Sequence, residues 1–171
     1  VRSIHFPRAV LPIAIVIKQL RVFMYALPIM VVILVITGEP ITWQWLLAPV
    51  ALLLILMFSL GMALVMARVV ATVQDVSEVL PYLLRIWGYM SGVMIPIADR
   101  LSQLGMPPWA TFLIEINPGT VYLNCMRDAL MDSYFSPGGA WNWALAVAWA
   151  LVMLPFGLWF FWRAEDRYGR G

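Results

Sequence analysis

A long uncharged stretch is the feature that most constrains how this chain can fold. No charged residue occurs between Glu39 and Arg68, and nearly all residues from Trp45 to Val73 are apolar. A helix needs roughly 20 mainly apolar residues to cross the hydrocarbon core of a bilayer. The stretch therefore predicts a membrane-spanning helix.

The composition of the whole chain supports a membrane protein. Its 171 residues are 63% hydrophobic and only 12% charged, with a mean hydropathy of +0.87. Soluble domains carry roughly 25% charged residues, and a small soluble fold keeps too much surface exposed to hide this apolar content. We predict an all-α, polytopic transmembrane helical bundle. The net charge of +2 gives no reason to expect a nucleic-acid partner.

Three further segments have the apolar content of membrane spans: Leu11–Thr37, Val79–Ala98 and Trp141–Trp162. Lys18 and Arg21 lie in the first part of the earliest segment, where their long side chains can reach the lipid headgroups. The middle segment is the weakest, because Arg85 interrupts it and we expect Pro81 to break it. Together with the central stretch, these segments predict four spans.

The first residue is Val1 rather than methionine, and no signal-peptide pattern opens the chain. We expect the N-terminal part of the subunit to be missing, so four spans are a lower bound. Residues 1–171 then form a single transmembrane domain.

The segment between the last two spans predicts a re-entrant hairpin. Two apolar stretches, Pro107–Ile116 and Thr120–Met131, are each too short to cross a bilayer. Asn117-Pro118-Gly119 between them is a strong turn signal. Membranes tolerate such a break where protein covers the backbone. We expect residues 107–133 to form two half-length helices on the outer face.

The distribution of basic residues predicts the orientation. Alternating spans place nine of the eleven Lys and Arg residues on one side, which the positive-inside rule makes cytoplasmic. Only Arg100 and Arg127 fall on the other side. The nine are Arg2, Arg8, Lys18, Arg21, Arg68, Arg85, Arg163, Arg167 and Arg170.

The chain offers few residues for catalysis. It contains no GxxxxGK[ST] loop, no HExxH motif and no GxSxG motif. Its one cysteine, Cys125, and one histidine, His5, cannot form a metal cluster. We predict a non-catalytic subunit without a cofactor of its own, so a partner must supply energy for any uphill transport.

Charged residues of the hairpin are the best candidates for function. Charges at membrane depth usually pair or line water, so Glu115, Arg127, Asp128 and Asp132 could belong to a polar path. Alternatively, the hairpin lies at the outer interface with these charges solvated.

Five short segments are informative in their order and spacing: Phe6-Pro7-Arg8-Ala9-Val10-Leu11-Pro12, Gln74-Asp75-Val76, Ser91-Gly92-Val93-Met94, Asn117-Pro118 followed by Arg127, and Phe160-Phe161-Trp162-Arg163-Ala164-Glu165. Together they resemble ABC-2 type permeases of polysaccharide export. Gln74 stands where that family usually has Arg, and Gly92 where it usually has Pro.

The resemblance implies an ATP-driven exporter in a bacterial plasma membrane. The subunit would have six spans, of which the first two are missing here. It would work as a homodimer, surrounded by membrane lipid, with two ATPase subunits that bind ATP and Mg²⁺. The substrate would be a lipid-linked polysaccharide. A cytoplasmic coupling segment, residues 1–12, and the segment from 74 to 80 would contact the ATPases through Phe6, Pro7, Arg8, Asp75 and Glu78.

Aromatic residues provide candidates for a glycan path, because sugar rings stack on aromatic faces. The aromatic candidates are Tyr82, Trp87, Tyr89, Trp109 and Tyr122. Each of them could equally be an interfacial or packing residue. The complete predicted path and outer gate comprises Arg85, Trp87, Tyr89, Glu115, Asn117, Pro118, Tyr122, Arg127 and Asp128.

Two other functions stay open at this point. An ABC-2 exporter of a small drug or lipid would share most of these features. A membrane-embedded glycosyl- or acyltransferase would need a clustered acidic site, and the outer carboxylates are its only candidates.

Overall fold

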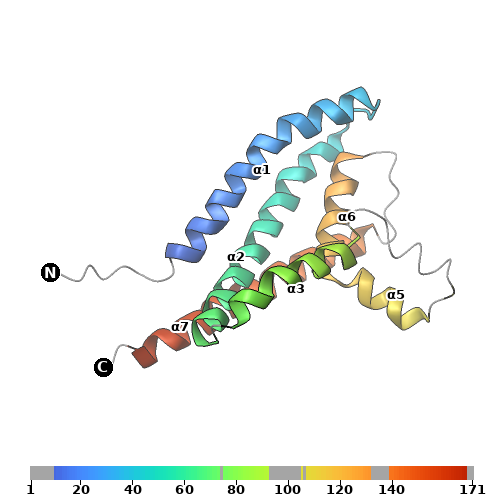
Figure 1. Ribbon diagram of the computed structural model, residues 1–171. Coiled ribbons are helices and arrows are strands. Elements are labelled where there is room, and N and C mark those ends of the chain that lie inside the picture. The colour runs from blue at the N-terminus through green and yellow to red at the C-terminus, as the bar shows by residue number, and fades with distance from the viewer. Residues whose placement is uncertain (1–9, 74, 93–104, 106, 132–138, 169–171) are drawn as a thin grey trace.

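The computed structural model describes residues 10–73, 75–92, 105, 107–131 and 139–168, with side chains up to Arg163 in the last range. All regular structure in these ranges is helical, which confirms the predicted all-α class. Figure 1 shows an elongated bundle. Its elements are α1 (Val10–Ile36), η1 (Trp43–Leu47), α2 (Ala48–Thr72), α3 (Val76–Met90), α5 (Pro108–Glu115), α6 (Pro118–Leu130) and α7 (Ala140–Tyr168).

Three segments of the described chain are long and apolar enough to cross a membrane: Val10–Ile36, Trp43–Thr72 and Ala140–Arg163. They confirm three of the four predicted spans. We use "outer end" for the end of the bundle at η1 and "inner end" for the end at Arg68 and Arg163, following the distribution of basic residues.

The fourth predicted span differs from the expectation. The helix α3 has 15 residues, which at about 1.5 Å each make roughly 22 Å, less than the roughly 30 Å hydrocarbon core. The predicted break at Pro81 is wrong, because α3 continues through this residue. A proline removes one backbone hydrogen bond, which a mostly exposed helix can tolerate. Residues 93–98 of the predicted span lie outside the described ranges.

The most extensive helix pair consists of α2 and α7, and two glycines set its closest approach. A Cβ atom on Gly157 would lie 2.8 Å from the Cα atom of Gly61. A Cβ atom on Gly61 would lie 2.8 Å from the backbone nitrogen of Leu154. The two backbones therefore touch, as small residues allow in membrane helix pairs.

Arg68 of α2 joins the inner ends of α2 and α7. Its guanidinium donates a hydrogen bond to the Phe160 carbonyl and lies 4.0 Å from the centroid of the Phe160 ring. Hydrogen bonds and cation–π contacts of a partly buried guanidinium stabilise more than exposed ones.

Replacing Arg68 by alanine should therefore lower the free energy of unfolding by about 2 kcal/mol. Denaturant titration of the permease in mixed micelles measures this change. Arg163→Ala is the matched control, because Arg163 is exposed and lies 5.2 Å from the Trp159 ring. Equal losses from the two substitutions would contradict the assignment of Arg68 as a helix-pair contact.

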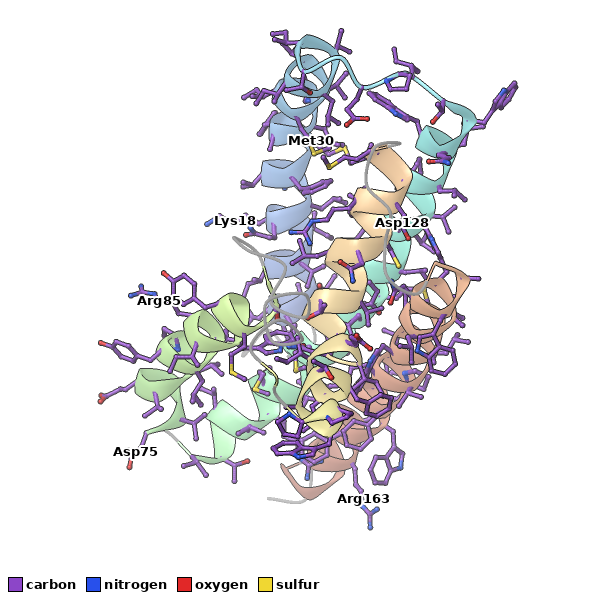
Figure 2. The ribbon with its side chains drawn as sticks, turned by 90° about the vertical axis from the view of Figure 1, so that its right-hand side faces the viewer. Lys18, Met30, Asp75, Arg85, Asp128 and Arg163 are labelled. Atoms are coloured by element: carbon purple, nitrogen blue, oxygen red, sulfur yellow. The ribbon has the colours of Figure 1, made fainter. Side chains whose placement is uncertain are left out.

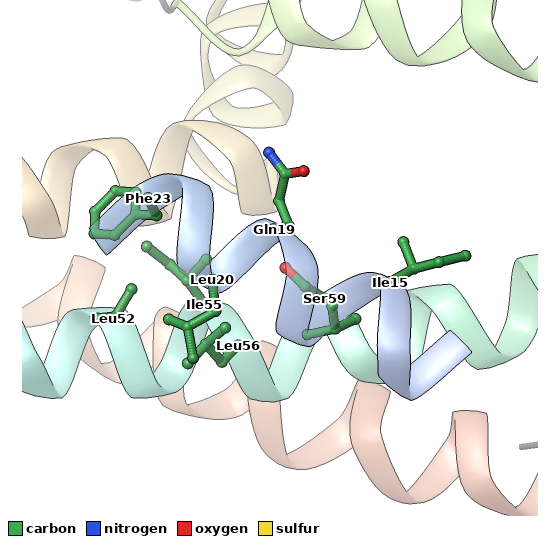
Figure 3. Close-up of a pocket in the computed structure, with 9 residues that line it drawn as sticks. Ile15, Gln19, Leu20, Phe23, Leu52, Ile55, Leu56 and Ser59 are labelled. Carbon is green, nitrogen blue, oxygen red and sulfur yellow. The ribbon is translucent and has the colours of Figure 1, made fainter. Parts of the chain in front are cut away.

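The helix α1 lies at the edge of the bundle. Only Pro12 and Leu34 of its 27 residues are buried. A cavity of about 270 Å³ separates part of α1 from α2, lined by apolar side chains of both helices together with Gln19 and Ser59 (Figure 3). The core thus lies among α2, α6 and α7 rather than at α1.

Candidate functional site

The helix α6 is short but deeply buried. Its 13 residues make roughly 20 Å, too little to span a bilayer. It packs against α2, α7 and η1. At its outer end, Ala129 and Leu130 form a buried cluster with Leu34 of α1. Seven of its side chains are buried, three of which carry an amide or hydroxyl group: Thr120, Val121, Tyr122, Asn124, Cys125, Ala129 and Leu130.

The break between α5 and α6 occurs at the predicted place. The helix α5 ends at Glu115, and α6 begins at Pro118 with Asn117 as its N-cap. The Asn117 Oδ1 atom accepts a hydrogen bond of 3.1 Å from the Gly119 N–H, and a proline suits the first helical position because its missing N–H would be unpaired there. Figure 1 shows α5 leaving α6 at an angle. We call residues 115–119 the elbow.

Asn117 also binds the end of α3. The Trp87 indole N–H donates to Asn117 Oδ1 over 2.8 Å, and the Asn117 Nδ2 group donates to Ser91 Oγ over 3.3 Å. The Thr120 hydroxyl donates to the Ser91 carbonyl over 3.3 Å. We call Trp87, Ser91, Asn117, Gly119 and Thr120 the Asn117 network.

Gly119 has a steric reason to be glycine. A Cβ atom at this position would lie 2.7 Å from the Cβ atom of Ser91. The close approach of α6 to Ser91 therefore depends on the missing side chain. Ser91 itself is 4% exposed.

Arg127 extends the contact between α6 and the end of α3. Its guanidinium donates to the Gly92 carbonyl over 3.1 Å and to Asn124 Oδ1 over 3.5 Å. Side chains of a helix point towards its N-terminus, so Arg127 reaches back towards the elbow. The carbonyls after α3 thus receive donors from α6.

An aromatic cluster surrounds Phe58 of α2. The Phe58 ring centroid lies 5.3 Å from that of Tyr122, 6.3 Å from that of Trp149 and 6.5 Å from that of Trp87. The Tyr122 hydroxyl donates to the Ala146 carbonyl over 3.0 Å. The Trp149 indole N–H donates to the Ile116 carbonyl over 3.0 Å. Both polar groups therefore bind backbone within the bundle.

The structure brings together only part of the predicted gate. Trp87, Asn117, Pro118, Tyr122 and Arg127 meet around the elbow through the contacts above. Asp128 is half-buried on α6 and has interactions of its own. Arg85 and Tyr89 are exposed on α3 outside this cluster, and Glu115 is exposed at the first position of the elbow.

The predicted coupling residues lie elsewhere. Asp75 and Glu78 are exposed at the inner end, beside the start of α3. Figure 2 shows Asp75 and Arg85 projecting away from the bundle. Phe6, Pro7 and Arg8 lie outside the described residues.

Several residues of the site escaped the sequence interpretation. Phe58, Ser91, Gly119, Thr120 and Trp149 all contribute contacts, but none was among the predicted site residues. Ser91 is the one with a usable signal, since it belongs to one of the segments that carried the family resemblance. Phe58 lies in a uniformly apolar helix, where the sequence carries no sign of its central position.

Hydrogen bonds hold the polar groups of this site in place. Among the side chains that the structure describes, no group of three His, Cys, Asp or Glu residues could hold a metal ion. Within the same ranges, every buried polar side-chain atom has a hydrogen-bond partner. Such satisfied networks hold elements in a defined arrangement.

Comparisons with known proteins identify relatives. The profile of the ABC-2 type transporter family matches residues 5–131, which include every element from α1 to α6. The chain is also 32% identical over 116 residues to the O-antigen export system permease protein RfbA of Myxococcus xanthus. This match covers 68% of the chain but 43% of that relative's length. No solved structure matches the chain.

Proposed function

Because the chain belongs to the ABC-2 type transporter family, we propose that it is part of the membrane subunit of an ATP-driven exporter of lipid-linked polysaccharide. The membrane would be the plasma membrane of a bacterium. Two copies of the subunit would assemble with two ATPase subunits. The observation that supports the polysaccharide most directly is the similarity to a permease named for O-antigen export.

Energy for transport would come from the partner ATPase. The chain has no phosphate-binding GxxxxGK[ST] loop. Asp75 and Glu78 are exposed at the inner end, in the turn after α2 and the first turn of α3. Exposed carboxylates on the cytoplasmic side offer charge complementarity to a partner, so we assign the coupling contact to this turn together with residues 6–8.

Replacing both Asp75 and Glu78 by alanine should reduce permease-dependent ATP hydrolysis at least about tenfold, if the pair contributes about 1.4 kcal/mol to the productive contact. The unfolding free energy should change by less than about 0.5 kcal/mol, because both side chains are exposed. Rates of ATP hydrolysis by the reconstituted complex measure the first effect. Glu39→Ala, at the outer end, is the control; an equal loss from this control would exclude a specific inner contact.

The outer half of the path would be controlled by the elbow. A buried helix that is too short to cross, with polar groups at its start, is unusual in an apolar bundle. Irregular backbone at membrane depth is tolerated where it is covered by protein or lines a water-filled cavity. We assign the elbow and α6 to the outer gate.

The proposal is tested by co-reconstituting the full permease with its ATPase in liposomes that contain a lipid-linked glycan. Protection of the glycan from an added glycosidase reports its transfer between leaflets. ATP-dependent transfer that requires this subunit is the expected result. Equal transfer without the subunit would contradict the proposal. ATP-dependent movement of a fluorescent drug or phospholipid, without movement of the glycan, would favour a small-molecule exporter instead.

A further inference from the structure

The helix α3 is attached to the bundle mainly at its two ends. None of its side chains is buried, and Tyr82, Leu83, Ile86 and Tyr89 are each more than half exposed. The two residues that follow it, Ser91 and Gly92, are buried. Four side-chain hydrogen bonds join α3 and its C-terminal turn to α6 or its cap. Figure 1 shows α3 running from the end of α2 to the elbow.

At the outer attachment, side chains of α6 supply donors to the carbonyls that follow α3. The last carbonyls of a helix and the first N–H groups of another have no partner within their own helices. After α3, the Ser91 carbonyl accepts from Thr120, and the Gly92 carbonyl accepts from Arg127. At the start of α6, Asn117 caps Gly119 while it accepts from Trp87. Side chains of α6 therefore satisfy carbonyls at the end of α3, and Trp87 of α3 binds the residue that caps α6.

The inner attachment is the turn between α2 and α3, where the Val76 N–H donates to the Val73 carbonyl over 3.2 Å. The helix α2 ends at Thr72 and α3 begins at Val76. Asp75 and Glu78 belong to this turn and to the first turn of α3, and both are exposed. A force applied at this turn acts directly on the start of α3. Few contacts along the rest of α3 would resist its movement.

We propose that α3 is a strut that transmits displacement from the inner turn to the elbow, and that Asn117 and Arg127 are the positioning residues that fix its outer end. An α-helix is stiff along its axis because nearly all of its interior backbone groups are bonded within it, and α3 stays continuous through Pro81. Coupling between distant sites requires such a rigid element together with defined contacts at both ends. The proposal rests on the proposed function in one respect, since ATPase closure supplies the force at the inner turn.

Distances between spin labels test the strut. The full permease carries labels at Tyr89→Cys on α3 and Leu113→Cys on α5, both exposed positions, in a Cys125→Ser background in lipid nanodiscs. The parent protein should give one narrow distance distribution. Asn117→Ala and, independently, Ser91→Ala should broaden it, because each removes a bond between α3 and the elbow. Thr111→Ala is the matched control, since the Thr111 hydroxyl bonds only to the Pro108 carbonyl of its own helix.

A second label pair tests transmission. Tyr25→Cys on α1 and Tyr89→Cys report the position of α3 relative to the rest of the bundle. In the complex with its ATPase, trapping the nucleotide should shift this distance while the Tyr89–Leu113 distance stays constant. In Arg127→Gln, nucleotide trapping should still shift the Tyr25–Tyr89 distance, but the Tyr89–Leu113 distance should now change as well.

Two results would overturn the proposal. One is an unchanged Tyr89–Leu113 distribution in both Asn117→Ala and Ser91→Ala. The other is a nucleotide-dependent change of this distance in the parent protein. Failure of the exporter assignment is separate: it would appear as absent glycan transfer, while the label distribution without ATPase still reports whether Asn117 fixes α3.

Discussion

Replacing Gly61 by valine is expected to abolish the packing of α2 against α7. The backbone of α7 occupies the space that a side chain would need, with the Leu154 nitrogen 2.8 Å from the added Cβ position. Overpacking usually costs about 1–3 kcal/mol. Here the obstacle is backbone rather than a flexible side chain, so we expect a loss above about 3 kcal/mol. The yield of monodisperse permease after detergent extraction should fall accordingly.

Gly88 provides the control for this prediction. It also lies within a helix, but nothing lies within 4 Å of the position where its Cβ atom would be. Gly88→Ala should therefore be neutral or stabilise α3 by about 0.5–1 kcal/mol, because alanine favours a helix over glycine. Gly157→Val should behave like Gly61→Val. Normal yield and stability of both valine variants would show that the two backbones do not touch.

The second large effect is expected at Asn117. Leucine has a similar size but neither accepts nor donates, so it would leave the Trp87 N–H and the Gly119 N–H without their present acceptor. The Ser91 hydroxyl would lose the Asn117 donor but keep its bond to the Trp87 carbonyl. An unsatisfied buried group costs about 1–3 kcal/mol. Since Asn117 is only half-buried, water can replace part of the lost hydrogen bonding. We therefore expect the free energy of unfolding to fall by about 2–4 kcal/mol. The rate of glycan transfer should fall by a larger factor than the amount of folded permease.

Asn117→Asp separates the two contributions. The aspartate keeps an oxygen that can accept from Trp87 and Gly119 but loses the donor to Ser91. Its unfolding free energy should lie between those of the parent and Asn117→Leu when both are measured by denaturant titration. Trp fluorescence provides a second readout, since Trp87 loses its acceptor only in the leucine variant. A leucine variant with parental stability and transport would contradict a role for the network.

Length and charge were sufficient to predict the long helices. The predicted segment Leu11–Thr37 differs from the observed span Val10–Ile36 by one residue at each end, and the predicted segment Trp141–Trp162 begins one residue after the start of α7. Such accuracy follows from the bilayer, which requires long uncharged runs and makes their ends visible as charges, prolines and glycines. The elbow was predictable for a local reason as well, because an Asn-Pro pair ends one helix and opens the next.

The interior of the bundle was not predictable in the same way. An apolar helix such as α2 looks alike on its lipid-facing and protein-facing sides, so Phe58 could not be recognised as the centre of the aromatic cluster. The contact between Gly61 and Gly157 joins residues far apart in sequence. The hairpin charges were expected to line a path or to be solvated, yet Arg127 donates to the Gly92 carbonyl over 3.1 Å.

Candidate path residues illustrate the same limit. Trp87 was predicted as an aromatic residue of the glycan path and Asn117 as part of a turn. Both were assigned to the predicted path, but no contact between them was predicted. In the structure they bond to each other over 2.8 Å. Their shared role depends on the meeting of α3 and α6, which single-helix patterns do not reveal.

The central claim is that the elbow dips into the bundle from the outer side. Cysteine accessibility in intact cells tests it most directly, using a membrane-impermeant maleimide and a Cys125→Ser background. Glu39→Cys should react from outside, Asp75→Cys only after permeabilisation, and Glu115→Cys from outside. Reaction of Glu115→Cys only from the cytoplasmic side would mean that residues 107–131 cross the membrane once, and it would contradict an outer gate at the elbow.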